Sequence, residues 1–219
     1  MTRTRPTIAS LASLLAVLAL FHTGAAQAGP VEDYNEGTKV YANGDLIAAM
    51  PLLRKAADAG HAAAQAALAE ILDQADSTTE AVEYYRKSAA QGNAEGQFGL
   101  GAMLAAGQGT PKNVAEARKW ITLAAEQDHK LAVNELALAY IAGGLEIPDA
   151  QRQSADALRW IRSAADNGYI TAMDKLAAAY RNGELGLAVD VKAAEQWAEK
   201  VRKIRGVRQG RRNKRSSEK

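Results

Sequence analysis

The chain has 219 residues, of which 24% are charged and 5% are aromatic, and this length is sufficient for one or two domains with a buried core. It contains no cysteine, which excludes disulfide bonds, thiolate metal sites, cysteine nucleophiles and lipid anchors on cysteine. The histidines are His22, His61 and His129, so a hydrolytic or metal centre would need mostly carboxylates, and the composition disfavours an enzyme.

The formal net charge of +2 conceals an uneven distribution of charge. Residues 202–219 contain nine Lys or Arg residues and one acidic residue, so they carry a net charge of +8. Residues 29–201 contain 16 basic and 24 acidic residues, so they carry a net charge of −8. The sequence therefore predicts an acidic body followed by a basic tail.

Residues 1–28 have the three parts of a secretory signal peptide. Two arginines near the start precede an apolar run over residues 8–21, and small residues follow as far as Ala28. The apolar run is shorter than the roughly 20 residues that a bilayer requires. We therefore predict export to the bacterial periplasm with cleavage before Gly29, and an uncleaved membrane anchor is the alternative.

The rest of the chain repeats itself. In one pattern, an Ala stands three residues before a large apolar residue, and a pair of small residues follows that large residue. The large residue recurs at Leu52, Tyr84, Trp120, Trp160 and Trp197. A second pattern of small residues and Leu, spaced three and four apart, fills the gaps near residues 62–72, 94–104, 132–140 and 172–180. This spacing predicts helices, and small residues allow close approach, so each unit is predicted to be helix A, a loop, helix B and a tight turn.

These patterns, A-x-A-Q-x-x-L-G-x-x-Y and A-x-x-W-x-x-x-A-A-x-x-G, resemble the Sel-one-like repeats, which are relatives of tetratricopeptide repeats. The resemblance covers about residues 31–205 and gives five units. It implies an all-α, right-handed α-solenoid that scaffolds or adapts protein complexes. The predicted organisation is a signal peptide over residues 1–28, a solenoid over 29–205 and a basic disordered tail over 206–219.

Candidate chemistry in the repeats is interpreted as structural. The three Trp residues share one repeat position, so they are predicted to be a packing ridge and not a carbohydrate platform. His61 and His129 fall at equivalent turn positions two units apart, where one metal ion cannot easily bind both. We predict no catalytic residue, no metal site and no cofactor.

A hydrolase that acts on cell-wall or β-lactam amides is kept as an alternative function. Ser216 and Lys219 fit the S-x-x-K motif of serine β-lactamases, but neither S-D-N nor K-T-G occurs in the chain. A cysteine-rich branch of the resembled family is linked to penicillin binding and hydrolysis. Because the paired cysteines of that branch are missing here, the motif is interpreted as chance.

The outer face of the A helices is the predicted protein-binding surface. The resemblance implies that A helices line the concave side of the solenoid, and a helical wheel of 100° per residue identifies the positions that face away from each hairpin. In the middle units these positions carry apolar side chains flanked by polar ones, which is the composition of a peptide groove. The predicted residues are Glu95, Phe98, Leu131, Asn134, Glu135, Leu138, Asp174 and Lys175. The alternative is that they pack between adjacent A helices.

The basic tail is the second candidate surface. Its residues Arg208, Arg211, Arg212, Lys214 and Arg215 are predicted to bind an anionic lipid or polysaccharide, and no nucleic-acid partner is expected for an exported protein. The alternative is a tail that only improves solubility. The favoured function is a non-enzymatic periplasmic scaffold or adaptor for another envelope protein, and an envelope spacer anchored by its tail is a further alternative.

The signal-peptide prediction is checked by intact-mass analysis of the protein recovered from the periplasmic fraction. The expected mass is that of a chain beginning at Gly29, because the small-residue site ends at Ala28. A mass that retains residues 1–28 would contradict cleavage and favour the membrane anchor.

Overall fold

The computed structural model describes residues 29–217, with side-chain environments as far as residue 207. This part of the chain contains ten α-helices, one short 3₁₀-helix (η1) and no strand. In chain order they are α1 (Pro30–Ala42), α2 (Leu46–Asp58), α3 (Ala62–Gln74), α4 (Thr78–Ala90), α5 (Ala94–Ala106), α6 (Val114–Glu126), α7 (Lys130–Ala142), η1 (Asp149–Gln151), α8 (Ala155–Asp166), α9 (Ile170–Asn182) and α10 (Val191–Ser217). The predicted signal peptide lies outside the described residues.

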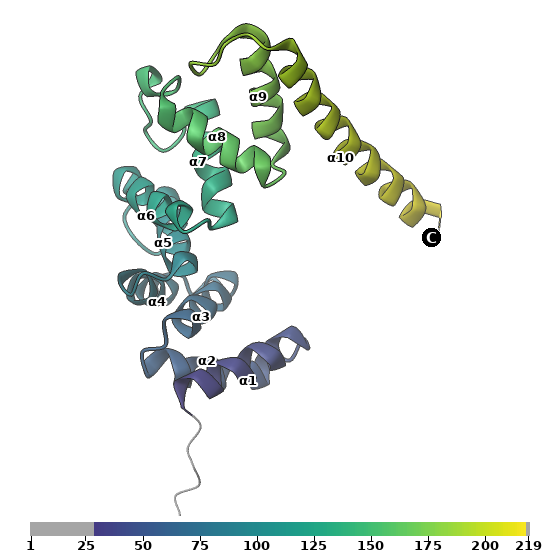
Figure 1. The fold of residues 1–219 in the computed structure, drawn as a ribbon. Coiled ribbons are helices and arrows are strands. Elements are labelled where there is room, and N and C mark those ends of the chain that lie inside the picture. Colours follow the sequence, from purple (N-terminus) through teal and green to yellow (C-terminus); the bar gives the residue numbers. More distant parts are fainter. Residues whose placement is uncertain (1–28, 218–219) are drawn as a thin grey trace, which may run out of the picture.

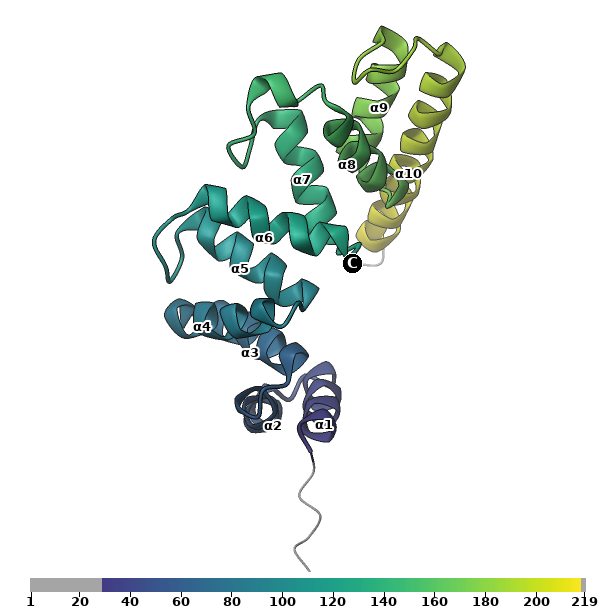
Figure 2. The ribbon, with the colours of Figure 1, turned by 60° about the vertical axis from the view of Figure 1, so that its left-hand side comes forward.

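The helices form five hairpins that follow one another along a curved stack (Figures 1 and 2). The odd-numbered helices are the predicted A helices and the even-numbered ones are the B helices. Each helix packs against its neighbours in the chain, and α3 also contacts α5, as α7 contacts α9. Direct contact between A helices of adjacent units indicates that they lie on the inner side of the curve. The predicted all-helical fold of five repeats is confirmed.

The hairpins are packed closely because α5 is rich in glycine. A Cβ atom at Gly99 would overlap the ring of Tyr85 on α4, and one at Gly96 would overlap the Ser88 side chain. On the other side of α5, a Cβ atom at Gly101 would lie 2.6 Å from Cγ1 of Ile121 on α6. The absent side chains therefore allow α5 to lie close to two B helices at once.

The ends of the B helices explain an unexpected feature of α10. The residue that follows each of the first four B helices and their C-caps has a positive φ, which closes the helix. These residues are Gly60, Gly92, Asp128 and Gly168, with φ of 91°, 81°, 59° and 82°. The equivalent position in the fifth unit is Arg205, within α10, and the helix continues to Ser217. Residues 206–217 are therefore helical in the structure, where the sequence pattern predicted a disordered segment.

The loop between α7 and α8 is longer than the others and is anchored at several points. Leu145 and Ile147 are buried in it. The Arg152 guanidinium donates from Nε to the Tyr140 carbonyl at 3.1 Å and also to the Ile141 carbonyl, so a cation caps the C-terminus of α7. The insertion thus fixes the end of the helix that carries half of the binding residues predicted on the A helices.

The aromatic ridge is part of the packing, as predicted. Tyr84 and Trp160 are only 6% and 5% exposed. Trp120 and Trp197 are partly buried against the same clusters of core residues. These side chains hold neighbouring units together and leave no row of exposed rings.

Substitution of Gly99 by Ala should lower the free energy of unfolding by about 1–3 kcal/mol, because the new methyl group overlaps the buried Tyr85 ring. Gly206→Ala is the matched control, since Gly206 lies in α10, where an added methyl group would meet no atom within 4 Å. The control should melt no lower than the wild type. Equal thermal midpoints for the two variants would contradict the close packing of α4 on α5.

Candidate protein-binding surface

The predicted binding residues do not all share one environment. Leu131 and Leu138 on α7 are 57% and 36% exposed, and Glu135 between them is exposed as well. These three residues occupy one face of α7 and are called the α7 strip. The remaining predicted residues on A helices divide into exposed side chains, Glu95 and Asp174, and partly buried ones, Phe98, Asn134 and Lys175.

Phe98 lies at the junction between two units and is not a free anchor. Its ring packs on the ring of His129, with centroids 4.9 Å apart, and the side chain contacts the core cluster of the following units. Tyr34 occupies the equivalent position in the first unit and packs on His61 at 4.7 Å. Phe98 therefore fits the alternative of packing between adjacent units, because the next unit covers it.

His61 and His129 cap the N-termini of α3 and α7. Nδ1 of His61 accepts a hydrogen bond from the backbone N–H of Ala64, and Nδ1 of His129 accepts one from Ala132, at 3.1 and 3.2 Å. With Nδ1 as the acceptor, the ring nitrogen that can donate is Nε2. Nε2 of His129 then donates to the Glu95 carboxylate at 3.0 Å. Within the described residues, no group of His, Asp and Glu side chains is arranged to hold a metal ion.

Asp174 and Lys175 are engaged in ion pairs. Asp174 accepts a hydrogen bond from Arg205 of α10 at 2.7 Å, although both side chains are about half exposed. Lys175 donates to Glu184 in the following loop, and this hydrogen bond lowers the pKa of the Glu184 carboxyl. Both predicted residues therefore stabilise the last unit, and neither projects freely.

The inner side of units two to four is acidic. Burial raises the pKa of the Tyr85 hydroxyl, and the nearby carboxylates of Glu70, Asp73 and Glu95 raise it further. Glu135 adds a fourth carboxylate on α7. Among the described residues, the buried Oδ1 atom of Asn134 has no hydrogen-bond partner. The surface thus combines two exposed leucines with carboxylates.

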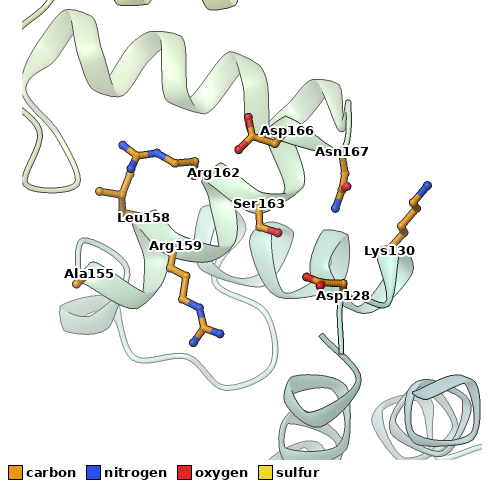
Figure 3. Close-up of a pocket in the computed structure, with 9 residues that line it drawn as sticks. All are labelled: Asp128, Lys130, Ala155, Leu158, Arg159, Arg162, Ser163, Asp166 and Asn167. Atoms are coloured by element: carbon orange, nitrogen blue, oxygen red, sulfur yellow. The ribbon is translucent and has the colours of Figure 1, made fainter. Parts of the chain in front are cut away.

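An open hollow of about 610 Å³ lies between the α6–α7 turn and α8 (Figure 3). The sequence pattern does not reveal it, because its residues belong to two units and share no motif. The hollow is lined by Asp128, Lys130, Ala155, Leu158, Arg159, Arg162, Ser163, Asp166 and Asn167. Arg159 lies over the Trp160 ring and Arg162 donates to the Tyr180 hydroxyl at 3.2 Å, so both guanidinium groups already have structural contacts.

The predicted residues of the basic tail lie at the far end of α10. Arg208, Arg211, Arg212, Lys214 and Arg215 belong to the helical backbone of α10, but their side chains lie outside the described part of the structure. The S-x-x-K match also extends beyond the described residues. No helix in the described part of the chain has the length and apolar content needed to cross a membrane.

A family model for the Sel1 repeat matches five consecutive segments, at residues 24–61, 62–93, 94–129, 131–169 and 170–200. The chain belongs to the Sel1 repeat family. Its first four matched segments, within the described residues, each contain one A–B hairpin, and the fifth contains α9 and the start of α10. Comparison with curated proteins finds no match.

Solved structures of bacterial Sel1 repeat proteins are similar to this chain. A Sel1 repeat protein from Oxalobacter formigenes is 28% identical with a TM-score of 0.61, over 78% of this chain and 70% of that one. The antigen c5321 of uropathogenic Escherichia coli is 26% identical with a TM-score of 0.69, and the match spans 80% of this chain but 38% of c5321. A Sel1 repeat protein from Klebsiella pneumoniae is 21% identical with a TM-score of 0.52, over 78% of this chain and 85% of that one, and shares the fold.

Substitution of His129 by Ala should lower the free energy of unfolding by about 1 kcal/mol through loss of the N-cap of α7. His129→Asn should retain the cap, because Asn93 caps α5 from the equivalent position with its Oδ1 atom 2.9 Å from the Gly96 nitrogen. Both variants lose the ring packing on Phe98, so their difference in denaturant midpoint isolates the cap. Identical midpoints for the Ala and Asn variants would contradict the capping role.

Proposed function

We propose that the protein is a non-enzymatic scaffold or adaptor of the bacterial envelope, which binds another protein through the α7 strip. Membership of the Sel1 repeat family supports protein binding in general. The assignment to the periplasm rests on the signal peptide predicted over residues 1–28. The partner is defined by the chemistry of the strip, which suits a peptide segment with apolar side chains.

The observation that carries this proposal is the exposure of Leu131 and Leu138. At the position of Leu131, α3, α5 and α9 carry small or polar residues, namely Ala63, Glu95 and Thr171, and α1 carries Val31. At the position of Leu138 they carry Glu70, Ala102 and Ala178. Leu131 and Leu138 lie about two turns apart, so α7 has two large apolar side chains on a face where the other A helices have at most one at these two positions.

The surroundings of the strip fit a peptide ligand. Exposed apolar side chains at the centre of a polar rim are typical of binding hot spots. Glu95 and Glu135 provide the rim on α5 and α7. The α7 helix is held at both ends, by the His129 cap and by Arg152, so the strip is presented on a rigid support.

The hydrolase alternative has no observation in its favour. The family model that matches describes a repeat, and the lining of the hollow beside α8 contains Ser163 but no histidine. A nucleophilic serine needs an adjacent base. The scaffold is therefore the function that the described residues support best.

Site-specific photocrosslinking in living cells tests the proposal. A photoreactive amino acid at Leu131 should give a discrete crosslinked protein, because this side chain is exposed on the strip. The matched control is Leu123, an exposed leucine on the B helix α6, which should give no such product. The Glu135→Lys variant should weaken the crosslink at Leu131.

The crosslinked species would be identified by mass spectrometry. Failure to crosslink at Leu131, or the same product from Leu131 and Leu123, would contradict binding through the α7 strip.

A further inference from the structure

The turn between α1 and α2 carries large apolar side chains that the fold leaves exposed. Tyr41 at the end of α1 is 39% exposed, and Leu46 and Ile47 at the start of α2 are 44% and 90% exposed. We call these three residues the apolar tip. They lie on either side of a polar turn, in a first unit that has no preceding repeat within the described residues.

The exposure of Ile47 is specific to the first unit. The equivalent positions at the start of the other B helices are Thr79, Ala115, Ala155 and Lys192. These small or polar residues show that the position needs no apolar side chain for packing. Ile47 therefore contributes little to the fold. Because its side chain is almost completely exposed, contact with an apolar environment would remove this apolar surface from water, which is favourable.

The second part of the surface is the end of α10. Residues 205–217, which we call the basic arm, contain six Arg or Lys residues and no acidic residue. The arm exists because Arg205 replaces the left-handed residue that closes the other B helices. Its continuous helical backbone extends beyond the packed part of α10.

The tip and the arm lie on the same side of the molecule. Figure 1 shows the free end of α10 and the α1–α2 turn extending toward the same side of the stack, although they belong to opposite ends of the chain. Figure 2 shows them one above the other after a rotation of 60°. A single extended surface can therefore touch both.

We propose that the apolar tip and the basic arm together form a docking surface for an anionic lipid bilayer. Phospholipid headgroups complement the positive charge of the arm, and the interfacial region accepts the side chains of Ile47, Leu46 and Tyr41. Stable attachment of a peripheral protein generally takes two weak signals, and here one is electrostatic and the other apolar. A soluble anionic polymer would complement the positive charge of the arm, but it has no apolar interior that could accept the side chains of the tip.

The charge of the remaining surface determines how the protein is oriented on the bilayer. Residues 29–201 carry a net charge of −8, so an anionic bilayer repels the body and attracts only the arm. Contact is then confined to the tip and the arm. The bilayer-docked protein is attached peripherally, and the docking surface is separate from the α7 strip.

Vesicle co-sedimentation tests this inference with the chain from Gly29 to Lys219. The probes are phosphatidylcholine vesicles with and without phosphatidylglycerol. We expect binding only when phosphatidylglycerol is present, with at least a roughly tenfold loss between low salt and about 0.5 M salt, because salt screens the arm. The double variant Arg211→Glu and Arg212→Glu should reduce binding at least tenfold.

The apolar tip is tested by Ile47→Ser, which should weaken vesicle binding about fivefold or more. Val189→Ser is its matched control, because Val189 is 63% exposed in the α9–α10 loop, away from the tip, and should bind as the wild type does. Circular dichroism of each variant checks that the helices are intact.

Three results would overturn the proposal. The first is no binding to vesicles that contain phosphatidylglycerol. The second is unchanged binding by folded Ile47→Ser, which would show that the arm alone binds polyanions. The third is equal weakening by Ile47→Ser and Val189→Ser, which would show a general effect of lost surface apolarity.

Discussion

The close approach of each A helix to the B helices on either side is the constraint on which the rest of the structure depends. In α5 it is made possible by Gly96, Gly99 and Gly101, whose missing side chains leave room for Ser88, Tyr85 and Ile121. Packing on two sides uses most of the surface of an A helix and leaves one narrow inner face. Large side chains on that face, such as Leu131, therefore have no partner within their own hairpin, and the binding proposal follows from this geometry.

The helices and their pairing could be predicted from the sequence because both depend on local spacing of small and apolar residues. The packing of Phe98 could not be predicted, since a helical wheel describes one hairpin and the ring of His129 belongs to the next unit. The run of basic residues predicts disorder after residue 205, whereas α10 continues to Ser217. A signal was present in the sequence, since Arg205 stands where the other units have Gly or Asp.

Within residues 29–217, the first and the last unit each have a neighbouring repeat on one side only. On α10, Arg202 stands where the earlier B helices have the buried Ala89, Ala125 and Ala165, and it pairs with Glu195 at 2.7 Å. This substitution gives the outer face of the last unit a polar character, which is typical of terminal units of solenoids. The first unit instead keeps exposed apolar residues at its tip, so the two ends are not equivalent.

Hydrogen exchange of the free protein, followed by mass spectrometry, tests most directly the claim that the α7 strip rests on a stack held together by nearest-neighbour packing. In such a stack the units with neighbours on both sides are the most stable. The account predicts that backbone amides of α5 to α8 exchange most slowly, and that those of α1 and of α10 beyond Arg205 exchange fastest among the helices. Exchange of α7 as fast as that of α1 would contradict it, because the strip would then lack a rigid support.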